Sequence, residues 1–354
     1  MRWYAFLLYP FTVLYDLVTR LRNCFFDLGW LKSTPSPIPS IVVGNLSVGG
    51  TGKTPMVEYL IRMMKKEKKL ATLSRGYGRK RKGFLQASSQ TSPDEIGDEP
   101  FQIYQKYGNE ISVFVGEDRA KALNEIASMS DSPEVVILDD AFQHRYVTGD
   151  LKILLTTFQR PFFSDFILPM GRLRESRIGA KRADVIIVSK SPEILNAKVQ
   201  GDYKSRALDY CRPETPVLFS SIVYGEPVPL VQKMRFSPKI ILLTGLANNQ
   251  PLVEYVVRKY ELLKVLSYPD HHDYSEVDLD NVRSFWKQHV SQNAVVLTTE
   301  KDAVKVKSNA PKGFLEEIPI FVLPIEVRFS SSDEQALVKL IQQKVFKKER
   351  NLSE

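Results

Sequence analysis

The chain has 354 residues, with 49 basic and 41 acidic side chains and therefore a formal net charge of +8. Apolar residues make up 43% and charged residues 25%, a globular balance that excludes a disordered or collagen-like chain. Domains commonly hold about 100–200 residues, so two domains are expected. Two cysteines, Cys24 and Cys211, argue against a disulfide-stapled secreted fold and fit a reducing compartment. The positive charge suggests an acidic partner, either phosphates, an anionic membrane surface or nucleic acid.

The first segment, residues 3–18, is apolar and aromatic but is interrupted by Pro10 and Asp16. It is shorter than the roughly 20 apolar residues that a membrane-spanning helix needs. From Tyr9 onward its apolar positions recur at helical spacing, and basic residues follow them. The pattern predicts an amphipathic helix, which either lies in a bilayer interface or packs on the core of its own domain.

A Pro- and Ser-rich segment at residues 33–40 predicts a domain boundary. Beyond it, short Val/Ile/Leu runs alternate with helical patterns, which is typical of an α/β fold with a doubly wound, mostly parallel sheet. Strands are expected at 41–45, 70–74, 111–116, 135–140, 151–157, 184–190, 216–224 and 239–246. The expected domains are an N-terminal helix (1–32), a first α/β domain (33–215), a second, smaller α/β domain (216–345) and a polar tail (346–354).

The segment SVGGTGKT matches the phosphate loop pattern G-x-x-x-x-G-K-[ST], with serine in place of the first glycine. It follows an expected buried strand and precedes an amphipathic helix. Backbone N–H groups of such a loop and the helix N-terminus bind phosphate oxygens. Lys53 would reach the β- and γ-phosphates of a nucleotide, and the Thr54 hydroxyl would bind Mg²⁺. The nucleotide-binding residues are therefore expected to be Ser47, Val48, Gly49, Gly50, Thr51, Gly52, Lys53 and Thr54.

The run VVILDD places Asp139 and Asp140 at the carboxyl end of an expected strand. Open α/β sheets bind ligands at that edge. One of these two carboxylates would hold Mg²⁺, directly or through water.

Two classes of phosphate-loop protein compete at this point. One is a small-molecule kinase, and the other is a nucleotide-switched ATPase whose loop reads KGGxGKT. Val48 occupies the position of that first lysine, which favours the kinase. A nucleic-acid motor is a third alternative, but the sequence contains no recognisable nucleic-acid module.

A kinase needs a group that orients or deprotonates the acceptor hydroxyl. Two clusters offer one: Asp98 and Glu99 in IGDEP, and His271 and His272 in PDHHDY. An imidazole beside a carboxylate can take and relay a proton near neutral pH.

Nine motifs resemble those of one family and stand in the same order. They are NLSVGGTGKTP, LSRGYG, GDEP, VGEDR, ILDDAFQHR, LPMGRLRE, LLTGLANN, PDHHDY and LTTEKDAVK. From the first helix to about residue 325 the sequence is similar to the tetraacyldisaccharide 4′-kinase family of the lipid A pathway in Gram-negative bacteria. The resemblance implies transfer of the γ-phosphate of ATP to the 4′-hydroxyl of a tetraacylated glucosamine disaccharide 1-phosphate. It also implies ATP and Mg²⁺ as cofactors, a lipid substrate, and docking of the first helix on the cytoplasmic face of the inner membrane. Neither nucleic acid nor an obligate protein partner is expected.

The resemblance also implies roles for individual residues. Asp98 would be the general base and would pair with His271, although His272 stands beside it; the site would then close between the two domains. Asp139 and Asp140 would serve Mg²⁺, with Glu99 farther out. The residues expected to contact substrate or ATP phosphates are Arg75, Arg119, Gln143, His144 and Arg172.

Overall fold

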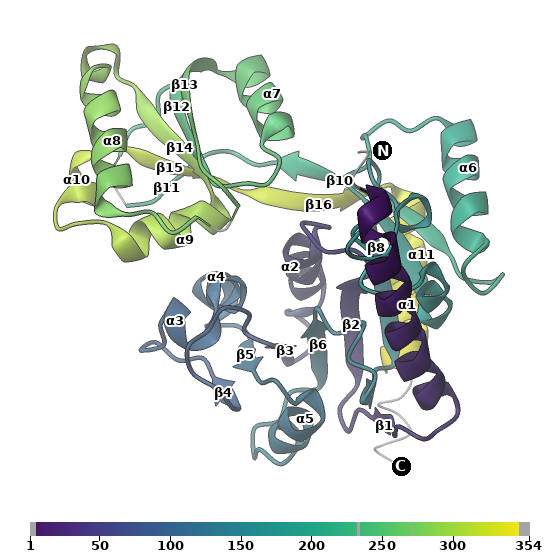
Figure 1. Cartoon of the computed structure of the whole chain (residues 1–354). Helices are drawn as coiled ribbons and strands as arrows, with labels where there is room; N and C mark the ends of the chain where they lie inside the picture. The colour runs from purple at the N-terminus through teal and green to yellow at the C-terminus, as the bar shows by residue number, and fades with distance from the viewer. Residues whose placement is uncertain (1–4, 232–233, 271, 347–354) are drawn as a thin grey trace. The chain divides into compact units, whose positions relative to one another are not determined.

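The computed structural model describes residues 5–231, 234–270 and 272–346 and divides the chain into two units (Figure 1). The first unit contains Met1–Ile222 and Val327–Glu354, and the second contains Val223–Glu326. The chain leaves the first unit through β10 (Val217–Tyr224) and returns through β16 (Ile325–Phe329).

This division differs from the expected ranges 33–215 and 216–345. β16 lies beside β10 at the edge of the large sheet of the first unit. The helix that follows, α11 (Ser331–Ile341), buries Leu337 and Ile341 in the core of the same unit. Residues 347–354, which make up most of the expected polar tail, lie outside the described residues.

The large sheet has the strand order β16-β10-β9-β8-β2-β6-β3-β5-β4. Adjacent strands from β10 to β5 are parallel, and β4 runs antiparallel to β5. The further strands are β2 (Ser40–Asn45), β3 (Leu70–Ser74), β4 (Leu85–Gln86), β5 (Ser112–Val115), β6 (Val135–Asp139), β8 (Leu151–Thr157) and β9 (Val185–Ser189). A separate small pairing joins β1 (Thr34–Pro35) to β7 (Val147–Thr148). The expected strands in this unit and the fold class are confirmed.

Helices cover both faces of this sheet, because alternate residues of β2 enter different cores. Ile41 and Val43 pack with Leu60 of α2, whereas Val42 packs with Leu123 of α5. Continuous burial of β2 is what a central parallel strand requires. The helical elements of this unit are α1 (Ala5–Asp27), α2 (Lys53–Met64), α3 (Pro93–Ile96), α4 (Asp98–Tyr107), α5 (Arg119–Ala127), η1 (Phe162–Ser164), η2 (Arg177–Arg182), α6 (Ala197–Leu208), α11 and η4 (Gln342–Phe346).

The second unit has a smaller sheet of order β11-β15-β14-β12-β13, in which β11 is antiparallel to β15 and the other pairs are parallel. Its strands are β11 (Val228–Pro229), β12 (Lys239–Thr244), β13 (Glu261–Ser267), β14 (Val295–Thr299) and β15 (Ile320–Leu323). Its helical elements are α7 (Gln250–Lys259), α8 (Glu276–Lys287), η3 (Val290–Gln292), α9 (Glu300–Asn309) and α10 (Phe314–Glu317).

Helix α1 packs on the first unit through polar contacts. The Thr12 hydroxyl accepts a hydrogen bond from Met170 N (3.2 Å), and the Tyr15 hydroxyl donates to the Arg174 carbonyl (3.0 Å). The opposite face is apolar and more than half exposed at Leu7, Phe11, Leu14, Leu17, Val18 and Leu21. Among the described helices, none is long and apolar enough to cross a membrane.

Candidate active site

The phosphate loop connects β2 to α2 and is held by the strand that precedes it. The Asn45 amide donates to the Ser47 carbonyl (2.6 Å) and to the Thr51 hydroxyl (2.7 Å). Gly49 and Gly52 have φ angles of 103° and 84°, a left-handed conformation in which a side chain would be strained. The loop is therefore shaped by its glycines and fixed by one buried amide.

Helix α2 begins at Lys53, directly after this loop, and its N-cap residue Gly52 provides no side-chain cap. The first-turn N–H groups are therefore left for another acceptor, and a phosphate oxygen suits them. The Lys53 ammonium lies 3.6 Å from Asp140 Oδ1 at the end of the neighbouring strand β6. Loop amides, helix N-terminus and ammonium together form an anion site.

The two aspartates at the end of β6 have different surroundings. Asp139 is 2% exposed, and its Oδ1 has no hydrogen-bond partner among the residues that the structure describes. Burial, together with the nearby negative charge of Glu99, raises the pKa of Asp139 above its usual value. Asp140 instead accepts two contacts from Arg174, at 3.0 and 3.1 Å, besides that from Lys53. Of the two carboxylates, Asp139 is thus the one with an oxygen, Oδ1, that lacks a partner in the described part of the chain.

A buried carboxylate oxygen without a partner is costly, and a divalent cation would satisfy it. No cluster of three or more His, Cys, Asp or Glu side chains suited to a metal occurs within the described ranges. Mg²⁺ at a nucleotide site, however, needs one or two carboxylates together with phosphate oxygens and water. Asp139 and the partly exposed Thr54, in the first turn of α2, fit that requirement.

Asp98 and Glu99 form the start of α4, which is attached to α2 by a buried carboxylate. Glu58 of α2 is 1% exposed and accepts from Lys106 (2.6 Å) and Gln102 (2.9 Å) of α4. These contacts hold α4, which begins at the expected base, against α2, which begins at the phosphate-loop lysine.

The turn before α4 depends on a glycine. Gly97 has a φ angle of 92°, and a Cβ atom at this position would lie 2.8 Å from the Tyr77 carbonyl. The glycine-containing loop after β3 therefore packs directly against the residue that precedes Asp98.

Three of the expected substrate residues, Arg75, Arg119 and His144, form a cluster in which the two arginines carry the positive charge. Arg119 is 4% exposed, and burial together with the positive charge of Arg75 lowers its pKa to about 10. Burial and the charge of Arg119 lower the pKa of His144 to about 4, so its imidazole is neutral at pH 7. The negative charges of Asp139 and Asp140 act to raise the pKa of Arg119. The cluster therefore lies near the end of β6.

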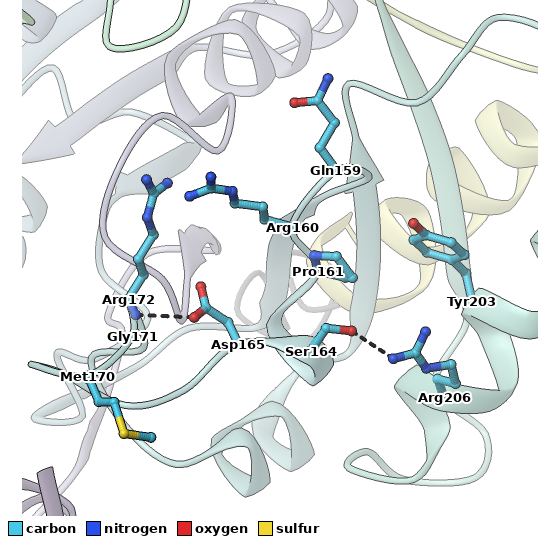
Figure 2. Close-up of a pocket in the computed structure, with 10 residues that line it drawn as sticks. All are labelled: Gln159, Arg160, Pro161, Ser164, Asp165, Met170, Gly171, Arg172, Tyr203 and Arg206. Atoms are coloured by element: carbon cyan, nitrogen blue, oxygen red, sulfur yellow. Dashed lines mark hydrogen bonds between the residues drawn. The ribbon is translucent and has the colours of Figure 1, made fainter. Parts of the chain in front are cut away.

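Arg172 lies beside the phosphate loop, because its carbonyl accepts a hydrogen bond from Val48 N (2.8 Å). Its side chain is exposed and lines a pocket of about 620 Å³ (Figure 2). The guanidinium is thus available to a ligand at the border between loop and pocket.

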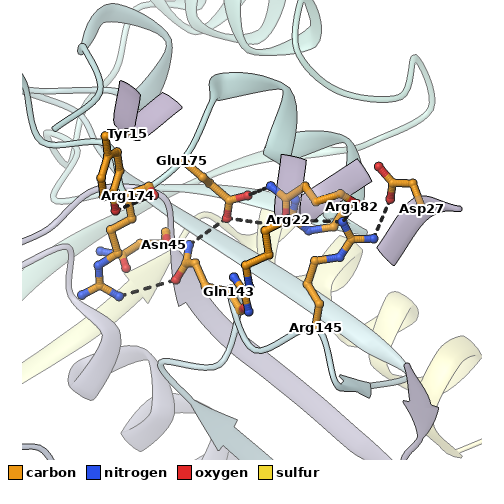
Figure 3. Close-up of polar contacts among 10 residues, drawn as sticks. Tyr15, Arg22, Asp27, Asn45, Gln143, Arg145, Arg174, Glu175 and Arg182 are labelled. Atoms are coloured by element: carbon orange, nitrogen blue, oxygen red, sulfur yellow. Dashed lines mark hydrogen bonds and ion pairs between the residues drawn. The ribbon is translucent and has the colours of Figure 1, made fainter. Parts of the chain in front are cut away.

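Gln143 connects protein segments. Its amide nitrogen donates to the Asn45 carbonyl (2.8 Å) and to Glu175 Oε1 (3.1 Å), as Figure 3 shows. Its Oε1 lies 3.5 Å from an Arg174 nitrogen. The donor that a substrate hydroxyl would use is already engaged in the described structure.

His271 lies outside the described residues, so its pairing with Asp98 stays a prediction. The neighbouring His272 belongs to the second unit, where its Nε2 lies 3.0 Å from Asp278 Oδ2. Its ring stacks on Tyr268 with centroids 4.6 Å apart. His272 is therefore held by contacts within its own unit.

Comparison with known proteins connects this site to one family. The family model described as tetraacyldisaccharide-1-P 4′-kinase, LpxK, matches residues 4–345. The chain belongs to this family. The tetraacyldisaccharide 4′-kinase of Flavobacterium psychrophilum is 39% identical over 339 residues, which cover 94% of this chain and 95% of that protein. The protein of the same name from Cytophaga hutchinsonii is 37% identical over 356 residues, 98% of each chain.

A solved structure of the LpxK family shares the fold. It is the crystal structure of LpxK from Aquifex aeolicus in its "apo" form in complex with ATP. The TM-score is 0.74 at 30% sequence identity, and the match covers 96% of this chain and 99% of that one. The family resemblance expected from the nine motifs is confirmed.

Sequence reasoning missed Glu175, which connects several segments of the LpxK site. Glu175 is 3% exposed and accepts from Asn23 of α1 (2.9 Å). It also accepts from Gln143 and from Arg182 of η2 (2.7 Å), as Figure 3 shows. It stands in the motif LPMGRLRE, from which only Arg172 was selected. The available signal was the position of this acid among three arginines, Arg172, Arg174 and Arg177.

Proposed function

We propose that this chain transfers the γ-phosphate of ATP to the 4′-hydroxyl of a tetraacyldisaccharide 1-phosphate. Membership of the LpxK family supports the reaction, and the ATP complex of the Aquifex aeolicus protein supports the nucleotide. The observation that carries the proposal is the phosphate loop, with Lys53 at its end, beside the unpartnered Oδ1 of Asp139.

The loop amides and Lys53 bind the phosphate chain, and Lys53 stabilises negative charge on the transferred group. Asp139 and Thr54 hold Mg²⁺, with Asp140 and Glu99 close by. When bound, the metal neutralises charge on the β- and γ-phosphates. Asp140 keeps Lys53 and Arg174 oriented before nucleotide arrives.

Asp98 accepts the proton of the 4′-hydroxyl while the hydroxyl oxygen forms a bond to the γ-phosphorus and ADP leaves. Phosphoryl transfer depends mainly on positioning and charge stabilisation, so the orientation of this carboxylate matters more than a strong base. His271 is the proposed partner that orients Asp98. Its position in PDHHDY supports the assignment.

The cationic side chains Arg75, Arg119 and Arg172, with His144, bind substrate or nucleotide phosphates. A neutral His144 beside Arg119 can donate one hydrogen bond without adding charge. Arg172 would reach these phosphates from its position beside the phosphate loop.

Helix α1 docks the enzyme on the cytoplasmic face of the inner membrane. Its exposed apolar face, opposite the polar contacts of Thr12 and Tyr15, supports this placement. The substrate is a lipid, so this docking brings the loop near the plane that holds the disaccharide headgroup.

The test is transfer of ³²P from γ-labelled ATP to purified disaccharide 1-phosphate lipid, followed by mapping of the phosphorylated carbon by NMR. Label at the 4′ position supports the proposal. ATP hydrolysis without labelled lipid contradicts it and favours a nucleotide-switched ATPase.

A further inference from the structure

We propose that the pocket beside α1 binds the phosphate headgroup of an anionic membrane lipid that is not the substrate. The proposal rests on the membrane docking proposed for α1. The pocket has a volume of about 620 Å³ and is lined by the segment after β8, by residues 170–172 and by α6 (Figure 2). Ligand sites typically enclose about 300–1,000 Å³, so its size suits a headgroup.

Cationic side chains predominate among the charged residues that line this pocket. Arg160, Arg172 and Arg206 line it with a single carboxylate, that of Asp165. Asp165 Oδ1 accepts from the backbone N–H groups of Phe166 (2.8 Å) and Arg172 (3.3 Å). The acid is thus engaged with its own loop, and the pocket keeps an excess of positive charge.

Two of the arginines, Arg160 and Arg172, form no ion pair in the part of the chain that the structure describes, and both line the pocket (Figure 2). Arg206 is fixed, because it donates to the Ser164 hydroxyl (2.7 Å) and lies 4.7 Å from the Phe163 ring centroid. Its nearest carboxylate, Asp202, is 3.9 Å away. Several guanidinium groups that line one pocket favour a phosphate, because a phosphate can accept paired hydrogen bonds from a guanidinium fork.

The position of the pocket points to a lipid. Met170, which lines it, donates its backbone N–H to Thr12 of α1. Thr12 and the exposed Leu14 lie on opposite sides of the helix, because two residues turn it by about 200°. With Leu14 at the acyl boundary, the protein surface beside Thr12 lies about one helix diameter, ~10 Å, above it. That height is within reach of the headgroup layer.

The pocket differs in chemistry from the phosphate loop. Its polar lining includes Gln159 and Ser164, which can bind hydroxyl groups of a glycerol headgroup. Arg172 lies at the border between the phosphate loop and this pocket, whereas neither Arg160 nor Arg206 has a role in the proposed transfer reaction. A lipid bound here would hold the protein at a fixed orientation on an anionic surface while α1 supplies apolar contact.

The test is co-sedimentation of the full chain with vesicles of phosphatidylcholine, either alone or with one-fifth phosphatidylglycerol. The variant R160Q/R206Q is compared with R258Q/R328Q, which removes the same charge from exposed positions elsewhere. Each basic residue at an anionic surface contributes roughly a fivefold gain in affinity. We expect R160Q/R206Q to bind anionic vesicles on the order of 20-fold more weakly than wild type. The control variant should stay within about twofold, and neutral vesicles should not distinguish the proteins.

A second variant distinguishes binding in a shaped pocket from general attraction by positive charge. R160K/R206K keeps the charge but loses the guanidinium fork, so its binding should fall between wild type and R160Q/R206Q. Binding equal to wild type would overturn the pocket and leave only general electrostatic attraction.

Four further outcomes have distinct meanings. Equal binding of R160Q/R206Q and its control overturns the pocket but leaves membrane docking intact. Failure of the wild type to bind either vesicle overturns docking and the pocket together. Millimolar inorganic phosphate at constant ionic strength should not remove the advantage of wild type; if it does, the pocket takes free phosphate rather than lipid. Transfer to detergent-dispersed substrate should be unchanged in R160Q/R206Q, and its loss would reassign the pocket to the substrate.

Discussion

The Lys53 ammonium lies 3.6 Å from Asp140 Oδ1, and Asp140 also binds Arg174 at 3.0 Å. The lysine that would bind the nucleotide is therefore already oriented by a carboxylate of the neighbouring strand. Because Arg174 remains as a partner, removal of Lys53 does not leave Asp140 without a cation.

Lys53→Ala should consequently reduce transfer without unfolding the protein. Loss of one group that stabilises charge on the transferred phosphoryl typically costs about 10²–10³ in kcat. Steady-state transfer and the thermal midpoint would be measured side by side. Lys66→Ala, an exposed lysine on the loop after α2, serves as the control. Transfer by Lys53→Ala at the rate of the control would contradict the assigned role.

Asp139 offers a test based on pH. Its folded-state pKa is raised, so the protonated form is favoured in the folded protein. Stability is therefore greatest below the unfolded pKa, near 4, and falls as pH rises through the raised folded value. Asp139→Asn cannot ionise at this position, so the variant does not lose stability in this way as the pH rises. Without Mg²⁺ and nucleotide, the variant should melt a few degrees higher than wild type at pH 8 and about equally at pH 4.5.

The same variant should need more Mg²⁺ for transfer, because one metal ligand is gone. Asp131→Asn is the control, since the Asp131 side chain is 90% exposed. A variant Asp139→Asn with unchanged Mg²⁺ dependence would show that the metal is held elsewhere.

Glu58 tests the connection between α2 and α4. Glu58→Ala leaves Lys106 and Gln102 without their buried acceptor and should lower the free energy of unfolding by about 3 kcal/mol. Because α4 begins at Asp98, kcat should fall more than the affinity for ATP changes. The control, Glu110→Ala, breaks an exposed ion pair with Lys65 and should cost less than about 1 kcal/mol. Equal effects of the two variants on kcat would argue against this positioning.

The proposed membrane docking of α1 can be tested by substitution of two exposed leucines. Leu14 and Leu21 are 60% and 52% exposed, so L14E/L21E should leave the thermal midpoint unchanged. It should nevertheless weaken vesicle binding strongly, because apolar insertion is lost and negative charge is added. The matched control is I194E/V277E, at positions that are 93% and 70% exposed. If control and variant bind vesicles alike, α1 is not the docking element.

Local sequence was sufficient for the elements that carry the chemistry. Strand β2 and the loop SVGGTGKT are defined by short-range features, namely a buried apolar run, glycines and a following helix. Asp139 could be placed at a strand end for the same reason. These predictions needed no knowledge of distant contacts.

The features that the sequence did not predict depend on tertiary contacts. The amide of Gln143 binds the Asn45 carbonyl and Glu175, which the sequence did not indicate, and its expected contact with substrate stays a prediction. Residues 327–345 follow the second unit in sequence yet join the sheet and core of the first. Periodicity identifies strands and helices, but it does not report which of two sheets a strand joins or which polar groups meet.

The central claim is that Asp98 serves as the base of a lipid kinase. The most direct measurement is phosphate transfer from ATP to the disaccharide 1-phosphate by wild type and Asp98→Asn, with ATP affinity measured in parallel. We predict 4′-phosphorylated lipid from wild type, loss of about 10²–10⁴ in kcat for the variant, and nearly unchanged ATP affinity. Asp98→Asn with the turnover of wild type would contradict the account.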